Sequence, residues 1–224
     1  MTLHACTVAK RAVSRAAEGL ARPAAAAFQD VADCERELDR LDQEIDERVA
    51  FAVAQSKVSQ AREVLACLKF ITDLERIGDL VCTFGSHAQT MGSRIEMADV
   101  NDLIRMASIL EKMLADAYDG FSSRDVERAV AIVRADAEID RLRNLIFIRN
   151  VTQHQGDMGT ATIGVLFMTQ CLERAGDHAV NLGEEICHVI TGHTIRHMRR
   201  QMDKSYEQKY LVWLREQARR QAVG

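Results

Sequence analysis

Two almost identical six-residue segments carry the side chains with the clearest chemical capacity. LERIGD occupies residues 74–79, and LERAGD occupies residues 172–177. Each holds a glutamate and an aspartate four residues apart, so on an α-helix both carboxylates project from one face. Such a like-charged pair costs roughly a few tenths of a kcal/mol in water, and more where apolar neighbours desolvate it. A bound cation would offset that cost, and the repeated pairs therefore indicate a metal site.

A second acidic element also occurs twice, in each case before the segment just described. DQEID occupies residues 42–46, and DAEID occupies residues 136–140. The two elements recur at offsets of 94 and 98 residues, which predicts a divergent duplication with a four-residue change between the second and third helices of each half. If those two helices pack as neighbours, four carboxylates converge at each seam.

The carboxylates of both elements form the predicted metal-ligand set. They are Asp42, Asp46, Glu75 and Asp79 in the first half and Asp136, Asp140, Glu173 and Asp177 in the second. All-oxygen sites of this kind suit divalent or trivalent ions, with iron, zinc, manganese and magnesium all compatible and several ions per site allowed. Gly78 and Gly176 agree with this hypothesis, because a mid-helix glycine costs about 1 kcal/mol relative to alanine and is kept where a backbone or ligand comes close.

Two other interpretations remain open from these residues. The acids could instead pair with nearby arginines in ordinary surface salt bridges; the candidate arginines are Arg48, Arg76, Arg141, Arg143 and Arg174. A carboxylate-bridged metalloenzyme would need Glu-x-x-His on two helices, and the sequence has it only at Glu185 to His188. With no Gly-rich phosphate loop and no G-x-S-x-G, we predict no catalytic residues and a protein that is not an enzyme.

The rest of the sequence predicts an all-α fold that would position these acids. Apolar residues recur every three or four positions, only one proline is present, and strand signals are nearly absent. We expect six long helices, with breaks near residues 28–30, 55–56, 91–93, 120–123 and 155–157. Pro23 either kinks the first helix late in its course, which we favour, or starts the second helix at its first turn. They form two three-helix repeats, at residues 1–92 and 93–197, followed by a helical tail at residues 198–224.

Charge and composition narrow the location and the partners. The net charge is −4, but residues 195–224 carry +5 and the remaining 194 residues carry −9. The tail therefore resembles a basic amphipathic helix that could pack on the body or a dimer partner, dock an acidic protein, or lie on an anionic membrane surface. No nucleic-acid partner is predicted, because no reading motif accompanies the charge. Scattered cysteines, no signal-peptide pattern and no membrane-spanning run predict a cytoplasmic protein.

Residues 1–197 resemble the PhoU family of phosphate-uptake regulators. The resemblance rests on the two repeats, on LERAGDHAVN at residues 172–181 and on ITGHTIRH at residues 190–197. It implies a cytoplasmic all-α protein that binds metal clusters through E/D-x-x-x-D motifs and often forms a homodimer. It further implies a negative regulator of the phosphate-starvation response, linking the ATPase subunit of the phosphate ABC transporter to a sensor histidine kinase.

The family motif can be placed on individual residues. Glu75 and Asp79 match it in the first repeat, and Glu173 and Asp177 match it in the second. The resemblance also implies that Asn181 is a metal ligand or orients one. Thr83 stands at the corresponding position of the first repeat, which predicts a weaker site there.

Overall fold

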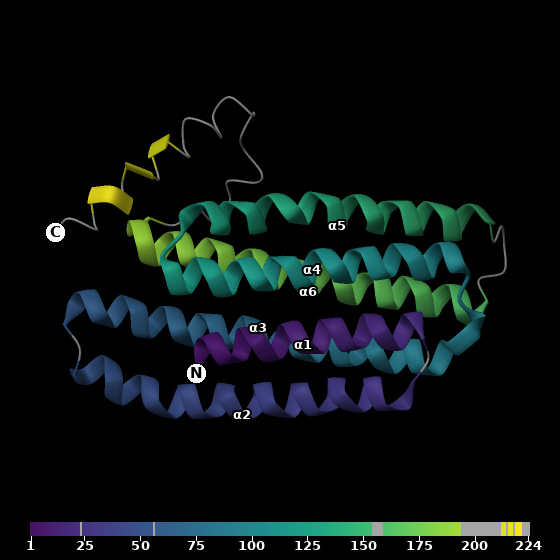
Figure 1. The fold of residues 1–224 in the computed structure, drawn as a ribbon, viewed down its shortest axis with the longest axis horizontal. Helices are drawn as coiled ribbons and strands as arrows, with labels where there is room; N and C mark the ends of the chain where they lie inside the picture. Colours follow the sequence, from purple (N-terminus) through teal and green to yellow (C-terminus); the bar gives the residue numbers. More distant parts are fainter. Residues whose placement is uncertain are drawn as a thin grey trace.

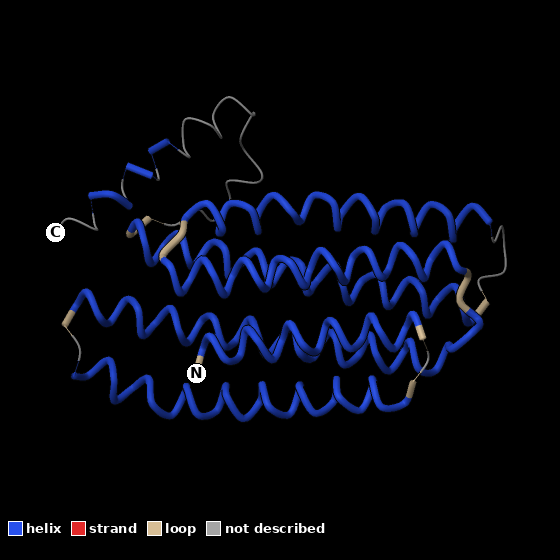
Figure 2. Tube along the Cα trace, in the orientation of Figure 1, coloured by secondary structure: helices blue, strands red, loops and turns tan. Residues whose placement is uncertain are grey.

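Long helices make up nearly all of the structure. The computed structural model describes residues 1–22, 24–55, 57–153 and 159–193 and, in the tail, 212–213, 215–216 and 218–220. The helices are α1 (Thr2–Ala21), α2 (Ala25–Gln55), α3 (Val58–Met91), α4 (Met97–Ser123), α5 (Val126–Gln153) and α6 (Thr160–Thr191), with a short 3-10 helix η1 (Gly92–Arg94). Figure 2 shows helices and loops and no strand in the described part of the chain, which confirms the all-α prediction.

The helices form two three-helix bundles that lie lengthwise against each other (Figure 1). The first bundle contains α1 to α3 and the second contains α4 to α6. They join through α1 against α4 and through α3 against α6, while α2 and α5 lie on the outer sides. Leucine, isoleucine, methionine and phenylalanine side chains fill both cores; fully buried examples are Phe70, Ile71, Leu74, Ile77, Leu103, Met106, Leu110 and Ile132. The apolar side of α3 therefore fixes which way its carboxylates point.

The helix breaks predicted near residues 55–56, 91–93 and 120–123 agree with the described helix ends, and the break predicted near residues 155–157 lies outside the described residues. The first predicted break was wrong. We expected the first break near residues 28–30, whereas α1 ends at Ala21 and α2 begins at Ala25. Arg22 has an extended backbone, with φ −139 and ψ 94, as expected for a residue before proline, because the proline ring clashes with a helical neighbour. Pro23 itself lies outside the described residues. The first helix thus ends before Arg22, and the second begins at Ala25, so the favoured kink within one continuous helix was wrong.

Where the second and third helices of each bundle pack together, the structural register of the two repeats is 98 residues. The missing Cβ of Gly78 faces Leu38, and that of Gly176 faces Asp136 and Ile139. Likewise, Gly85 faces Phe28 and Val31, and Gly183 faces Ala129 and Ile132. In both pairs of glycines, residues 98 positions apart occupy the same place, and α2 and α5 also end 98 residues apart. The expected four-residue change between helices is therefore wrong: the structural counterpart of Asp42 is Asp140, and DQEID and DAEID lie one helical turn out of register.

The described pieces of the tail pack on the second bundle. Trp213 and Ala218 are partly buried against the core, and the Trp213 ring lies 4.7 Å from that of His193, between centroids. Arg215 Nε donates to a carboxylate oxygen of Glu127, at the start of α5. These contacts favour the first of the three uses predicted for the tail. No described helix is long and apolar enough to cross a membrane.

Candidate metal centre

Carboxylates from α2 and α3 meet along the boundary of these helices, which we call the first seam. It consists of Glu35, Asp39 and Asp42 on α2 and Glu75 and Asp79 on α3. One carboxylate oxygen from each of Glu35, Asp39 and Asp79 can be chosen so that all three lie within 4.8 Å of one another. Three oxygens at such separations can surround a single small cation. Their side chains are only partly exposed.

The acids of the first seam oppose one another electrostatically. Burial raises the pKa of Glu75, and the charges of Asp79, Asp42 and Asp39 raise it further, while Arg76 acts in the opposite direction. Burial likewise raises the pKa of Glu35, with Asp39 and Asp79 adding to the effect. The pKa of Asp42 is raised by burial and then by Asp46 and Asp39. These carboxylates are thus held together at a cost that a cation would remove.

Glu35 and Asp39 were not among the predicted ligands. They form an E-x-x-x-D pair one to two turns before Asp42, so the spacing that singled out the other acids was present here too. The prediction rested on segments that occur in both halves, and neither residue has an acidic counterpart in the second half. The residues 98 positions later are Val133 and Ala137.

The corresponding second seam, between α5 and α6, contains Asp140, Glu173 and Asp177. Burial raises the pKa of Glu173, as do the charges of Asp177 and Asp140, while Arg143 and Arg174 lower it. Burial and the charge of Asp140 similarly raise the pKa of Asp177. Arg143 Nη2 lies 3.8 Å from Asp140 Oδ1, and Arg143 Nε lies 3.9 Å from Glu173 Oε1. A guanidinium therefore faces the acids of this seam.

The structure places three of the predicted ligands elsewhere. Asp46 is exposed on α2, and its charge acts on the first seam by raising the pKa of Asp42. Asp136 is 1% exposed, in the place that Leu38 takes in the first bundle, and faces Gly176. Asn181 donates through Nδ2 to Asp73 Oδ1 on α3, at 3.0 Å, so its amide joins the two bundles.

Salt bridges, the competing explanation for the acids, are partly present. Arg76 Nη1 lies 3.3 Å from Asp79 Oδ2, and Arg76 Nε lies 3.4 Å from Glu75 Oε2. The Arg76 side chain is 57% exposed, and an exposed pair of this kind is worth about 0–1 kcal/mol, so an entering cation could displace it. Arg48 and Arg141 pair instead with Glu44 and Glu138, outside the seams.

Comparison with known proteins decides the family. The PhoU domain model matches residues 2–86 and 103–186, one match in each bundle. This chain belongs to the PhoU family. A phosphate-specific transport system accessory protein PhoU homolog of Caulobacter vibrioides is 32% identical over 202 residues, covering 88% of this chain and 87% of that protein. PhoU homolog 1 of Thermotoga maritima is 29% identical, covering 76% of this chain and 75% of that protein.

Two solved PhoU structures share the fold. PhoU from Pseudomonas aeruginosa superimposes with a TM-score of 0.80 at 23% identity, covering 86% of this chain and 94% of that one. The phosphate transport system regulatory protein PhoU from Streptococcus pneumoniae gives 0.79 at 20% identity, covering 87% and 93%. The two-bundle PhoU architecture is thus common to all three chains.

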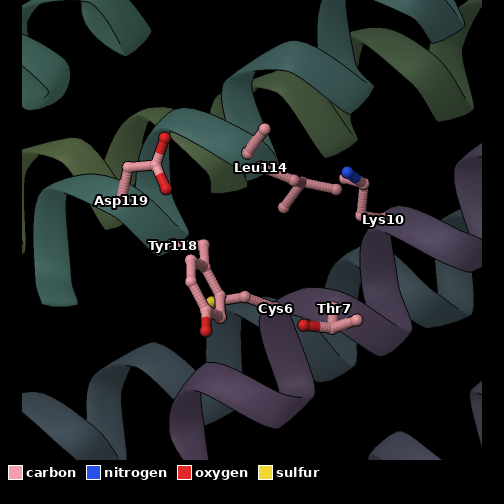
Figure 3. A pocket seen from close by; sticks show the side chains of 7 residues that line it. Cys6, Thr7, Lys10, Leu114, Tyr118 and Asp119 are labelled. Atoms are coloured by element: carbon pink, nitrogen blue, oxygen red, sulfur yellow. The ribbon is translucent and has the colours of Figure 1, made fainter.

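This PhoU-family chain also has a cavity away from both seams, between α1 and α4 (Figure 3). Its volume is about 310 Å³, and it is lined by Cys6, Thr7, Lys10, Leu114, Ala115, Tyr118 and Asp119. Burial raises the pKa of Cys6 to about 12, so the thiol stays protonated and is a poor nucleophile. The cavity therefore gives no support to covalent catalysis through this cysteine.

Proposed function

We propose that this PhoU-family protein regulates a phosphate transport system as a cation-dependent adaptor. The proposal draws its physiological context from the relatives, whose names describe accessory proteins of phosphate-specific transport. From the resemblance, the role is negative regulation between the transporter's ATPase subunit and a sensor histidine kinase, carried out in the cytoplasm by a homodimer. The observation that carries the cation requirement is the convergence of Glu35, Asp39 and Asp79.

The residues of the first seam fit a hard metal ion. Their donors are carboxylate oxygens from two different helices, and Glu35 and Asp39 make no ion pair among the described residues. A bound ion would supply positive charge and cross-link α2 to α3. Iron, manganese, magnesium and zinc all accept carboxylate ligands. Glu75 and Asp42, which share the field of these acids, could hold a second ion beside the first.

The ion would act on shape, with no reaction catalysed. A bound ion offsets the burial and the mutual repulsion that raise the carboxylate pKa values of the first seam, so the α2–α3 pair becomes more rigid and presents one surface to a partner. Glu185 and His188, the only Glu-x-x-His of the sequence, are engaged elsewhere: Lys69 Nζ on α3 donates to Glu185, and His188 Nδ1 lies 3.3 Å from Glu185 Oε1. Glu185 is thus committed to the contact between bundles and His188 to Glu185 within α6, which disfavours the di-iron enzyme alternative.

Complementation tests this proposal. A host lacking its own PhoU-family gene receives either the wild type or the Asp39→Asn, Asp79→Asn double variant, and phosphate uptake and a phosphate-starvation reporter are measured in phosphate-rich medium. We expect the wild type to lower the reporter and the double variant to fail at equal protein level. Arg40→Gln, on the same helix, serves as a control that should behave as wild type. Full regulation by the double variant would contradict the cation requirement.

A further inference from the structure

We propose that the two seams are not equivalent: the first is the cation site of this chain, and in the second Arg143 takes the place of a cation. This inference rests on the proposed cation-dependent function and specifies where the ion goes. It also reverses the expectation, drawn from Thr83 and Asn181, that the first site would be the weaker one.

The two seams differ in their number of charged groups. Five carboxylates share the first seam, and the arginines whose charges act on them are Arg36 and Arg76. Three carboxylates share the second seam, against Arg143 and Arg174. Counting only these groups, five carboxylates less two arginines leave an excess of three negative charges at the first seam, and three less two leave one at the second. A divalent or trivalent ion is matched to the first seam and not to the second.

The two seams also differ in the acids that the second helix of each bundle supplies. At the offset of 98, Glu35 and Asp39 correspond to Val133 and Ala137, so two of the three converging oxygen donors are absent from α5. Among the described residues, only Glu35, Asp39 and Asp79 bring three potential ligand atoms within 4.8 Å. The second seam keeps the two acids on α6 and Asp140 on α5, but it lacks counterparts of Glu35 and Asp39.

Arg143 lies between acids of α5 and α6. Its guanidinium approaches both Asp140 on α5 and Glu173 on α6, at 3.8 and 3.9 Å, and its charge also lowers the pKa of Asp177. Ile45, the residue 98 positions earlier, is buried in the first bundle and brings no charge. Arg143 thus reaches acids of both helices, whereas the ion pairs of Arg76 are both with acids of its own helix.

Measuring how many Mn²⁺ ions bind, and how tightly, to variants at each seam tests this inference. Metal-free protein is titrated with Mn²⁺, and free Mn²⁺ is followed by electron paramagnetic resonance. We expect Asp39→Asn to weaken binding by about tenfold or more, since even outer-shell changes at metal sites cost roughly 10–100-fold. Asp177→Asn, in the second seam, should leave the affinity and the number of bound ions unchanged.

A triple variant builds the first site into the second bundle. It combines Val133→Glu, Ala137→Asp and Arg143→Ile, which place the first-seam residues on α5. We expect this variant to bind twice as many Mn²⁺ ions as the wild type. The matched control, Val133→Gln, Ala137→Asn and Arg143→Ile, has similar shapes without the acids and should show no gain. Circular dichroism confirms that both variants remain helical.

The possible outcomes distinguish this inference from the function on which it rests. Loss of Mn²⁺ with Asp177→Asn as large as with Asp39→Asn would overturn the inequality of the seams and leave a cation-dependent regulator standing. Absence of any Mn²⁺ binding by the wild type would overturn both. Should the triple variant fail to fold, the two single substitutions still decide.

Discussion

At the scale of single residues, the main feature is a group of partly buried carboxylates at the first seam that repel one another. The raised pKa values of Glu35, Asp42 and Glu75 have burial as their first cause and neighbouring acids as the second. A carboxyl whose pKa is raised in the folded protein binds protons more readily there than in the unfolded chain. Its cost to stability is fully present above the folded pKa and is relieved as the pH falls through that value.

A thermal-unfolding series against pH tests this cost. We expect the difference in unfolding midpoint between Glu75→Gln and metal-free wild type to be positive at pH 7, by about 1–3 °C. The difference should shrink toward pH 4.5, because the wild-type carboxyl then becomes protonated. Glu37, Glu127 and Glu138 have lowered pKa values, so their stabilising pairs fail only at more acidic pH and do not obscure this window. Saturating Mn²⁺ should make the wild type the more stable protein; a midpoint difference that is independent of pH would contradict the account.

Much of this site could be predicted from residue spacing, and the remainder could not. Asp42, Glu75 and Asp79, and Asp140, Glu173 and Asp177, lie at the two seams because four-residue spacing beside an apolar stripe fixes the face of a helix. The same spacing cannot fix the register: a shift of four residues is about one turn and leaves a side chain on nearly the same face. Asp136 was therefore matched to Asp42, whereas the structure pairs it with Leu38.

At the scale of helices, close packing at glycine sets that register. A Cβ at Gly78 would lie 2.5 Å from Leu38 Cδ1, and a Cβ at Gly183 would lie 2.9 Å from the Ala129 carbonyl oxygen. The first obstacle is the end of a flexible side chain, and the second is backbone. Long helices were predictable from apolar periodicity, but these contacts between helices distant in sequence were not, because no local pattern encodes which turn meets which.

Alanine substitution at these glycines should separate the two cases. We expect Gly183→Ala to lower the free energy of unfolding by about 1–3 kcal/mol through overpacking against the backbone. Gly78→Ala should cost less once Leu38→Val makes room, because alanine then contributes about 1 kcal/mol of helix propensity. Urea unfolding measures both. Equal destabilisation at the two sites, with no recovery in the double variant, would show that the glycines do not act through these contacts.

At the scale of the whole molecule, the C-terminal half of α5 and the N-terminal half of α6 expose several large apolar side chains. Phe147 and Ile148 on α5 are 53% and 60% exposed, and Phe167 on α6 is 52% exposed. Leu145 and Ile163 are also exposed on the same pair of helices. Concentrated apolar exposure is typical of protein-binding surfaces. We expect a partner protein to contact this surface.

Polar substitution of that surface should separate partner binding from cation binding. We expect Phe147→Ser with Ile148→Ser to reduce co-purification of the transporter's ATPase subunit from membranes of phosphate-replete cells by about tenfold, which corresponds to about 1.4 kcal/mol. Thermal stability and Mn²⁺ binding should change little, because both side chains are exposed and lie outside the first seam. Undiminished co-purification would place the contact elsewhere on the molecule.

The most direct test of the central claim, that α2 and α3 together hold a cation, is anomalous diffraction from crystals grown with Mn²⁺. The account predicts a peak within about 2.0–2.6 Å of oxygens from Glu35, Asp39 and Asp79. It predicts no equivalent peak beside Asp140, Glu173 and Asp177. A first seam without a peak, with Arg76 closed over the carboxylates, would contradict it.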